Sequence, residues 1–179
     1  LFAVQTLAGA VNISLVFLQP DLLASRDAAP WMVRGGGHFA LIAGGALSLI
    51  PAGQASDRWS ARRMLVFANL TTTVALGLLL LRGSASTLDL LFVAAVGAFG
   101  GINNIAAVAE GNRLLPGQAS AVSALLMGMP WCIAALGPVV AGVLADPARG
   151  GTPAGALGWF MLLMPLGLAA ALRVRSRTP

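Results

Sequence analysis

The stretch GQASDRWSARR, residues 53–63, carries one acid and three arginines between two long apolar runs. Only 9% of the chain is charged and 58% is hydrophobic, so a concentration of charge at this point is informative. About 20 consecutive apolar residues are enough for a helix to cross the hydrocarbon core of a bilayer. Arginines gather in the short loops that join such helices. Residues 53–63 therefore predict a polar turn between two membrane-spanning helices.

The composition of the whole chain favours the same class of protein. A soluble domain is about half apolar and a quarter charged, whereas this chain of 179 residues has a mean hydropathy of +0.85. Its apolar residues are expected to face a lipid bilayer. The net charge of +5 comes from arginines that are scattered between apolar runs. Because they form no continuous basic stripe, nucleic acid is excluded as a partner.

Six segments have the length and hydropathy of transmembrane helices, which predicts an all-α membrane protein. Their approximate bounds are 3–19, 37–55, 64–82, 89–109, 119–145 and 155–172. Seven arginines lie in the loops after spans two and four and in the C-terminal tail, against four on the other side. This excess of positive charge predicts that the beginning of the chain and its tail lie in the cytoplasm.

The chain also contains a weak internal repeat at half its length. ALSLIPAGQASD (46–57) and ALGPVVAGVLAD (135–146) share five identical positions at an offset of 89 residues. The same offset lays spans one to three over spans four to six. Copies separated by three spans cross the membrane in opposite directions, as in the inverted repeats of many secondary transporters. The prediction is one unit, 1–179, built from a repeat in 1–88 and its inverted copy in 89–179.

The turn of residues 53–63 resembles the loop motif of the major facilitator superfamily. That motif reads Gly, two spacers, a small residue, Asp-Arg, a spacer, Gly and then basic residues. The matching positions are Gly53, Asp57, Arg58 and Arg62. Ser60 and Ala61 depart from it, because the family usually has Gly and a basic residue there. A second stretch, residues 114–146, resembles the eleventh span of fosmidomycin-resistance-type efflux proteins in that superfamily.

The resemblance implies half of a major facilitator fold, the C-terminal six-helix half of a twelve-span secondary transporter. Its partner would be an N-terminal six-helix half of the same protein, and the first residue, Leu1, is consistent with a piece of a longer chain. The implied function is efflux of a drug or metabolite by alternating access across a bacterial inner membrane. A small-molecule solute and the lipid bilayer are the other implied partners, and no cofactor is expected.

Loops of this kind act in the family as a cytoplasmic clamp that holds one conformation closed. The resemblance assigns this role to Gly53, Asp57, Arg58 and Arg62. Spans two and four end at the same face, so Arg58 or Arg62 is expected to approach Glu110 and to pair with it. Asp57 could sit against a helix N-terminus, where unpaired N–H groups carry partial positive charge. Alternatively, the arginines only set the topology of the chain.

Amide side chains recur inside two of the spans. Gln5, Asn12 and Gln19 are seven residues apart and therefore share one side of the first span. Asn103 and Asn104 lie in the fourth span, which is the counterpart of the first in the repeat. Polar groups at membrane depth face a cavity or the bundle interior, so Asn12 and Asn103, with Gln5 third, are predicted to line the substrate path. Interhelical hydrogen bonding is the alternative, and it is favoured for Asn104.

An enzyme is not expected. The chain has one histidine, one cysteine, no Gly-x-Ser-x-Gly sequence and no acid in the middle of a predicted span. An intramembrane enzyme needs a nucleophile with a base, or paired acids, at membrane depth. The sequence therefore predicts no catalytic residues and no metal ligands. Two other functions remain open beside half of a transporter: a six-span transporter that acts as a homodimer, and a membrane scaffold that transports nothing.

Overall fold

The computed structural model describes residues 1–174, and within them it contains only helices and turns. Six helices in this part of the chain are long and apolar enough to cross a membrane, as predicted. The first, third and fourth spans are α1 (Phe2–Ala24), α3 (Ala61–Leu81) and α4 (Thr87–Leu114). The second span consists of η1 (Met32–Gly36) and α2 (Gly37–Ser56). The fifth consists of α5 (Ala119–Ser123), η2 (Ala124–Gly128), α6 (Met129–Ala134) and α7 (Leu136–Ala145), and the sixth of α8 (Pro153–Met161) and α9 (Leu163–Leu172).

Serine caps explain why two spans begin earlier than expected. Ser60 precedes α3, and its hydroxyl accepts a hydrogen bond from the Arg63 N–H. Ser86 precedes α4, its hydroxyl accepts from the Leu88 N–H, and its own N–H donates to the Asp89 carboxylate. Such caps satisfy N–H groups that have no partner within the helix. A reading based on apolar runs places both helix starts too late because it ignores the caps.

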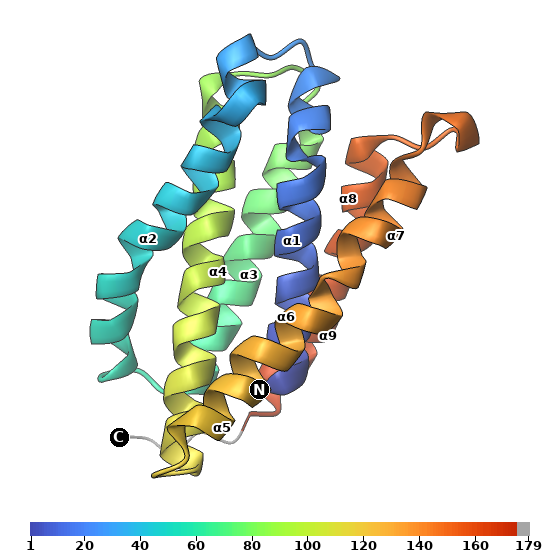
Figure 1. The fold of residues 1–179 in the computed structure, drawn as a ribbon. Coiled ribbons are helices and arrows are strands. Elements are labelled where there is room, and N and C mark those ends of the chain that lie inside the picture. Colours follow the sequence, from blue (N-terminus) through green and yellow to red (C-terminus); the bar gives the residue numbers. More distant parts are fainter. Residues whose placement is uncertain (175–179) are drawn as a thin grey trace.

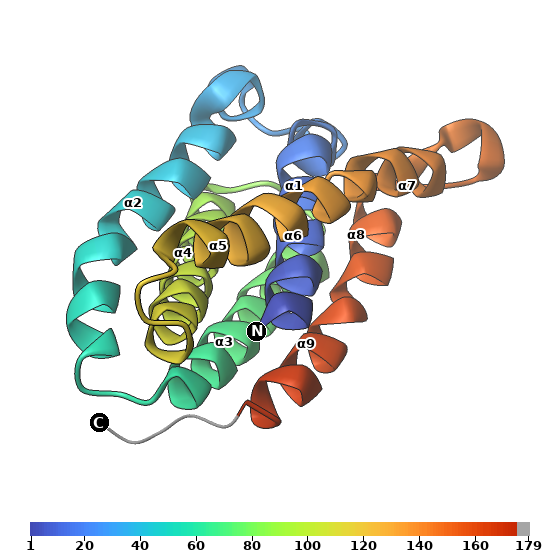
Figure 2. The same ribbon diagram turned by 60° about the horizontal axis from the view of Figure 1, so that its bottom comes forward.

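The six spans form a bundle around α1 and α4 (Figures 1 and 2). Helix α4 packs against α2 and α3, and α1 packs against the fifth span and against α8 and α9. In Figure 1, α3 lies behind α4, whereas the helices of the fifth span cross in front of α1. The N-terminus and the turn at 57–60 lie at the same end of the bundle (Figure 1), as an even number of spans between them requires.

Glycines allow α2 and α4 to approach each other closely. A Cβ atom on Gly44 would collide with the backbone of Ala94, and one on Gly97 would collide with the backbone of Leu41. Small residues of this kind let helix backbones meet in membranes, where dispersion and polar contacts drive helix association. This pair of glycines fixes the depth at which α2 crosses α4, and Gly97 also lines the cavity described below.

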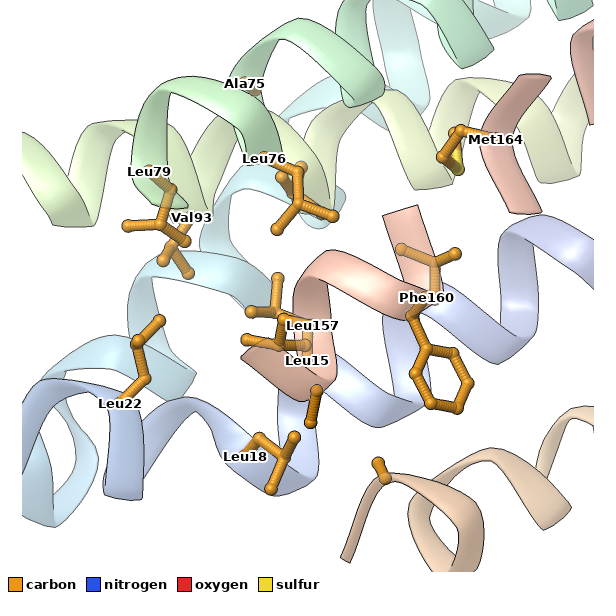
Figure 3. Packing of buried hydrophobic residues seen from close by; sticks show 14 of the residues in the cluster. Leu15, Leu18, Leu22, Ala75, Leu76, Leu79, Val93, Leu157, Phe160 and Met164 are labelled. Atoms are coloured by element: carbon orange, nitrogen blue, oxygen red, sulfur yellow. The ribbon is translucent and has the colours of Figure 1, made fainter. Parts of the chain in front are cut away.

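The interior of the bundle is filled with apolar side chains, most of them branched aliphatic (Figure 3). Leu15, Leu76 and Leu157 come from three different spans, and each is fully buried. The outer faces are equally apolar: Leu47 is 79% exposed and Leu81 is 85% exposed. A soluble protein does not leave so many large apolar side chains in water. The exposed faces therefore fit a multi-pass membrane protein, with lipid around the bundle.

Prolines interrupt the last two spans. The fifth span breaks at Ala135 and the sixth at Leu162, each three residues before a proline. A proline cannot donate to the carbonyl four residues earlier, and its ring clashes with that carbonyl. The first of these breaks separates α6 from α7 and lies two residues before Gly137. Trp131, on α6, lines the cavity described below together with residues of α1.

Candidate functional site

A cavity of about 250 Å³ lies between α1, α2, α4 and α6. Four amide side chains and one tryptophan project into an otherwise aliphatic and glycine-rich wall. The polar and aromatic members of this wall are Gln5, Asn12, Asn103, Asn104 and Trp131. No charged residue is among the residues that line it. The cavity is therefore a place where an uncharged molecule can find hydrogen-bonding groups at membrane depth.

A chain of amide hydrogen bonds joins three helices behind this wall. Asn69 on α3 donates through Nδ2 to Asn103 Oδ1 over 3.0 Å. Asn103 in turn donates through Nδ2 to Gln5 Oε1 over 2.6 Å, and Gln5 donates through Nε2 to Asn104 Oδ1 over 2.8 Å. Asn69, Asn103 and Gln5 are each more than nine-tenths buried. The chain of bonds fixes the rotation of α1 relative to α4, which brings the amides to one wall.

The fifth span joins the same network through its backbone. Pro130 has no N–H, so the Leu126 carbonyl cannot accept the usual helical hydrogen bond from four residues on. Gln5 Nε2 donates to this carbonyl over 3.2 Å. An unpaired carbonyl is costly in an apolar interior. A proline in one span thus creates the acceptor that a glutamine in another span satisfies.

The same device recurs beside the other end of the cavity. Pro20 removes the donor for the Val16 carbonyl, and His38 Nε2 lies 3.0 Å from that oxygen. Because a carbonyl can only accept, Nε2 carries the hydrogen in this contact. His38 therefore ties α2 to α1 through a single hydrogen bond. This contact holds one edge of the cavity wall, since Val16 also lines the cavity.

Asn12 differs from the other amides in its surroundings. Its Nδ2 donates to the Ala8 carbonyl in its own helix over 3.3 Å. Within residues 1–174, no hydrogen-bond donor reaches Asn12 Oδ1. In the same part of the chain, Asn104 Nδ2 has no acceptor. A Cβ atom on Gly100 would lie 2.8 Å from Asn12 Nδ2, so a glycine is what leaves room for this amide. The wall therefore offers Asn12 Oδ1 as a free acceptor and Asn104 Nδ2 as a free donor.

The structure brings the three predicted path residues to one surface. Gln5, Asn12 and Asn103 all line the cavity, although Asn103 is only 3% exposed. Gln19, on the same predicted stripe, is not part of the wall; it is buried beside Gly37 at the other end of α1. Whether a solute touches these residues stays a prediction.

Sequence reasoning missed two parts of this site. Asn69 was given no role, although an amide in the middle of an apolar span is the same signal that identifies Asn12. The carbonyl of Leu126 carries no side-chain signal, but Pro130, four residues later, marks it as an acceptor without a donor. Asn104 was expected to make an interhelical hydrogen bond, and its bond with Gln5 confirms this.

The expectation that Arg58 or Arg62 pairs with Glu110 is wrong. Glu110 pairs with Arg113 of its own helix, with 3.6 Å between Nη1 and Oε2, and neither Arg58 nor Arg62 approaches it as an ion pair. Arg113 also donates through Nη2 to the Ser56 carbonyl over 2.7 Å. An arginine three residues away on α4 reaches Glu110 at less cost in side-chain entropy than one from another helix. The link between α2 and α4 exists, but Arg113 makes it.

The other residues of the motif lie free of such contacts. Asp57, Arg58 and Arg62 are exposed. Asp57 is the C-cap residue of α2, and the N-terminus of α3 is capped by Ser60, so Asp57 does not hold a helix N-terminus in this part of the chain. A Cβ atom on Gly53 would meet no atom within 4 Å. Ser60, which departs from the family motif, therefore has a local structural role.

The opposite end of the bundle holds an ion pair that the sequence did not predict, between a buried carboxylate and a partly exposed arginine. Arg82 Nε lies 2.7 Å from the carboxylate of Asp89, which is completely buried. Beside them, Arg26 donates to the Leu79 carbonyl at the end of α3 over 2.9 Å. Burial lowers the pKa of Arg26, although Asp89 acts in the opposite direction. These groups lie away from the cavity and close the loops at this end.

The described residues contain no group of three or more His, Cys, Asp or Glu side chains that could hold a metal ion. No family model, no curated protein and no solved structure matches this chain. Function is therefore inferred from the geometry of the cavity and from the resemblance of residues 53–63 and 114–146.

Proposed function

We propose that this chain forms part of a membrane transporter that carries small uncharged solutes by alternating access. One observation carries the proposal: a cavity of about 250 Å³ with four amides in its wall lies between apolar spans. Polar groups at membrane depth are costly to keep. Hydrogen bonds between helices account for three of them, Gln5, Asn103 and Asn104. Asn12, however, bonds only its own helix. A hydrogen bond from a bound solute would account for a polar side chain at this position.

The packing of the spans supports an inverted repeat. Helices α2 and α3 flank α4, and the fifth and sixth spans flank α1. In the repeat, spans one, two and three correspond to spans four, five and six. The packing of α2 and α3 against α4 therefore corresponds to the packing of the fifth and sixth spans against α1. Ser48 and Gly137 stand at the offset of 89, and each meets the span that the repeat predicts as its neighbour. A Cβ atom on Gly101 would meet the Ser48 hydroxyl, and one on Gly137 would meet the Ser14 hydroxyl. Secondary transporters are built from such repeats around a central site.

The chemistry of the cavity favours an uncharged solute with a hydrogen-bond donor and acceptor. Asn12 Oδ1 offers an acceptor and Asn104 Nδ2 a donor, while Trp131 and the aliphatic side chains offer an apolar surface. A charge placed here would lose its hydration and meet no opposite charge among the lining residues. A flat molecule that bears an amide or hydroxyl groups therefore suits the site best.

The resemblance to the major facilitator superfamily supports the remaining parts of the proposal. They are efflux of a drug or metabolite, a bacterial inner membrane, and an N-terminal six-helix half that completes the path. Within this half, Arg113 rather than Arg58 or Arg62 is the residue that joins α2 to α4 at the motif end of the bundle. We assign to Arg113 the clamp that the resemblance predicts for this loop.

Flux measurements with solutes of different charge test the proposal. The full-length protein is reconstituted in proteoliposomes, with chloramphenicol as the first of a panel of uncharged aromatic amides. Tetraphenylphosphonium, a cation, and fosmidomycin, an anion, serve as the charged comparators. We expect saturable flux for uncharged members of the panel and none for the two ions. Flux of the ions alone would mean that the amide-lined cavity is not the path.

Single-site labelling gives a second measurement that does not depend on transport. Cys132 is the only cysteine of the chain, is exposed, and directly follows Trp131 in the cavity wall. A solute that occupies the cavity should slow the reaction of Cys132 with a maleimide. If no transported uncharged solute slows the labelling of Cys132, the transport path does not pass through this cavity.

A further inference from the structure

A second hollow, separate from the amide-lined cavity, lies between α2, α3 and α4 beside the turn at 57–60. Its volume is about 180 Å³, and every residue that lines it is apolar. The lining residues are Pro51, Ala52, Ala55, Trp59, Met64, Phe67 and Ile102. We call it the lateral groove. Trp59 and Phe67 are each more than two-fifths exposed, so the groove is open along its aromatic side.

The aromatic side of the groove continues into a series of edge-to-face ring contacts. The rings of Trp59 and Phe67 meet edge to face with 6.1 Å between their centroids, and Phe67 meets Phe99 in the same way over 5.6 Å. Tryptophan at the end of a transmembrane helix sits at the level of the lipid headgroups. These rings extend from the headgroup level at Trp59 into the hydrocarbon layer. A lipid acyl chain extends in the same direction and can lie alongside them.

Three exposed arginines lie in the turn and at the start of α3, close in sequence to residues that line the groove. Arg58 directly precedes Trp59, and Arg63 directly precedes Met64. Arg63 also stands four residues before Phe67 on α3, so both lie on the same helix face. Arg58, Arg62 and Arg63 are exposed, and no ion pair within residues 1–174 involves them. With Asp57 as the only acid in the turn, three positive charges and one negative charge leave a net charge of +2 at this place.

We propose that the lateral groove binds an anionic phospholipid. One acyl chain lies against Trp59 and Phe67, and the phosphate is held by the unpaired arginines of the turn. Charge complementarity selects this occupant: guanidinium groups bind phosphate through several hydrogen bonds at once, and basic pockets between spans recognise anionic headgroups. An uncharged partner helix would cover the groove but leave the arginines without counter-charges. Each arginine near an anionic headgroup contributes roughly fivefold to binding.

Fluorescence quenching by brominated lipids tests this site. The full-length protein is reconstituted in phosphatidylcholine bilayers that contain a small share of brominated phosphatidylglycerol or, in parallel, of brominated phosphatidylcholine. The difference between the native protein and Trp59→Phe isolates the signal of Trp59. We expect brominated phosphatidylglycerol to quench Trp59 more than brominated phosphatidylcholine does, and the excess to fall as ionic strength rises. Equal quenching by both lipids in the native protein overturns the proposal.

Variants separate the charge from the groove. Arg62→Gln should weaken the preference for phosphatidylglycerol by about fivefold, whereas Arg62→Lys should retain most of it. Arg34→Gln, which removes an exposed arginine at the other end of the bundle, is the matched control and should change nothing. Ala55→Phe should fill the groove and abolish the preference while all three arginines remain. If the preference for phosphatidylglycerol survives in Ala55→Phe, no acyl chain occupies the groove. The same conclusion follows if inorganic phosphate abolishes the excess quenching as readily as unlabelled phosphatidylglycerol does.

Discussion

Replacing Gln5 by leucine should destabilise the bundle more than any comparable change in the cavity wall. Gln5 makes three hydrogen bonds to other spans, with Asn103, Asn104 and the Leu126 carbonyl. Leucine has a similar volume and keeps the apolar contacts of α1. The substitution therefore removes the hydrogen bonds and leaves the packing in place.

The magnitude follows from these three contacts. A hydrogen bond between transmembrane helices contributes about 0.6 kcal/mol on average and about 1.7 kcal/mol at most. Three of them amount to roughly 2 kcal/mol at the average value. The Leu126 carbonyl and the Asn103 amide would also lose partners in a buried place, which adds about 1 kcal/mol or more. We expect Gln5→Leu to lower the free energy of unfolding by about 2–4 kcal/mol.

Asn12→Leu is the matched control, because both substitutions replace an amide in the same helix and the same cavity wall. Asn12 bonds only the Ala8 carbonyl of its own helix, so its loss should cost less than about 0.5 kcal/mol. Unfolding of the purified variants in mixed micelles with increasing dodecyl sulfate measures both free energies. If Gln5→Leu costs no more than Asn12→Leu, the amide network does not hold α1 against α4 and the fifth span.

Three further substitutions test the packing and the ion pairs. Gly44→Ala should destabilise strongly because its Cβ would collide with the backbone of α4, whereas Gly45→Ala, whose Cβ would meet its nearest atom at 3.5 Å, should be tolerated in the same unfolding assay. Asp89→Asn should cost about 1–3 kcal/mol because it removes a completely buried carboxylate that pairs with the partly exposed Arg82, whereas Asp146→Asn, in a largely exposed pair, should cost about 1 kcal/mol or less. Arg113→Gln should cost about 1–3 kcal/mol because it leaves the buried Glu110 carboxylate without its ion pair, and it should raise the accessibility of a cysteine placed at the end of α2, because Arg113 ties that end to α4.

The positions of the spans follow from the sequence because they depend on length and hydropathy alone. A run of about 20 apolar residues has one way to satisfy its backbone in lipid, which is a helix. The helix ends are set by local hydrogen bonds, such as those of Ser60 and Ser86, so an apolar run places them only approximately. The break at Ala135 has a cause that is visible in the sequence, because Pro138 removes a backbone donor from the helix.

The partners of polar side chains do not follow from the sequence in the same way. The heptad spacing of Gln5 and Asn12 puts both on one side of α1, and both line the cavity. The hydrogen bonds of Gln5 depend on how α1 is rotated against α4 and on a carbonyl that Pro130 leaves without a donor. The spacing of residues along one helix gives no information about either. Glu110 illustrates the same limit, because its partner is the arginine nearest in its own helix and not the one favoured by the motif.

Transport by the Asn12→Leu variant tests the central claim most directly. Asn12 lines the cavity and makes no hydrogen bond to another helix within residues 1–174, so its loss should affect a bound solute and spare the fold. Thr73→Val is the control, because Thr73 bonds the Asn69 carbonyl of its own helix and does not line the cavity. In the full-length protein at equal membrane levels, we predict that Asn12→Leu lowers the flux of an uncharged solute by about tenfold, as expected for the loss of one hydrogen bond of roughly 1.4 kcal/mol, while Thr73→Val transports normally. Unchanged flux in Asn12→Leu would contradict the account.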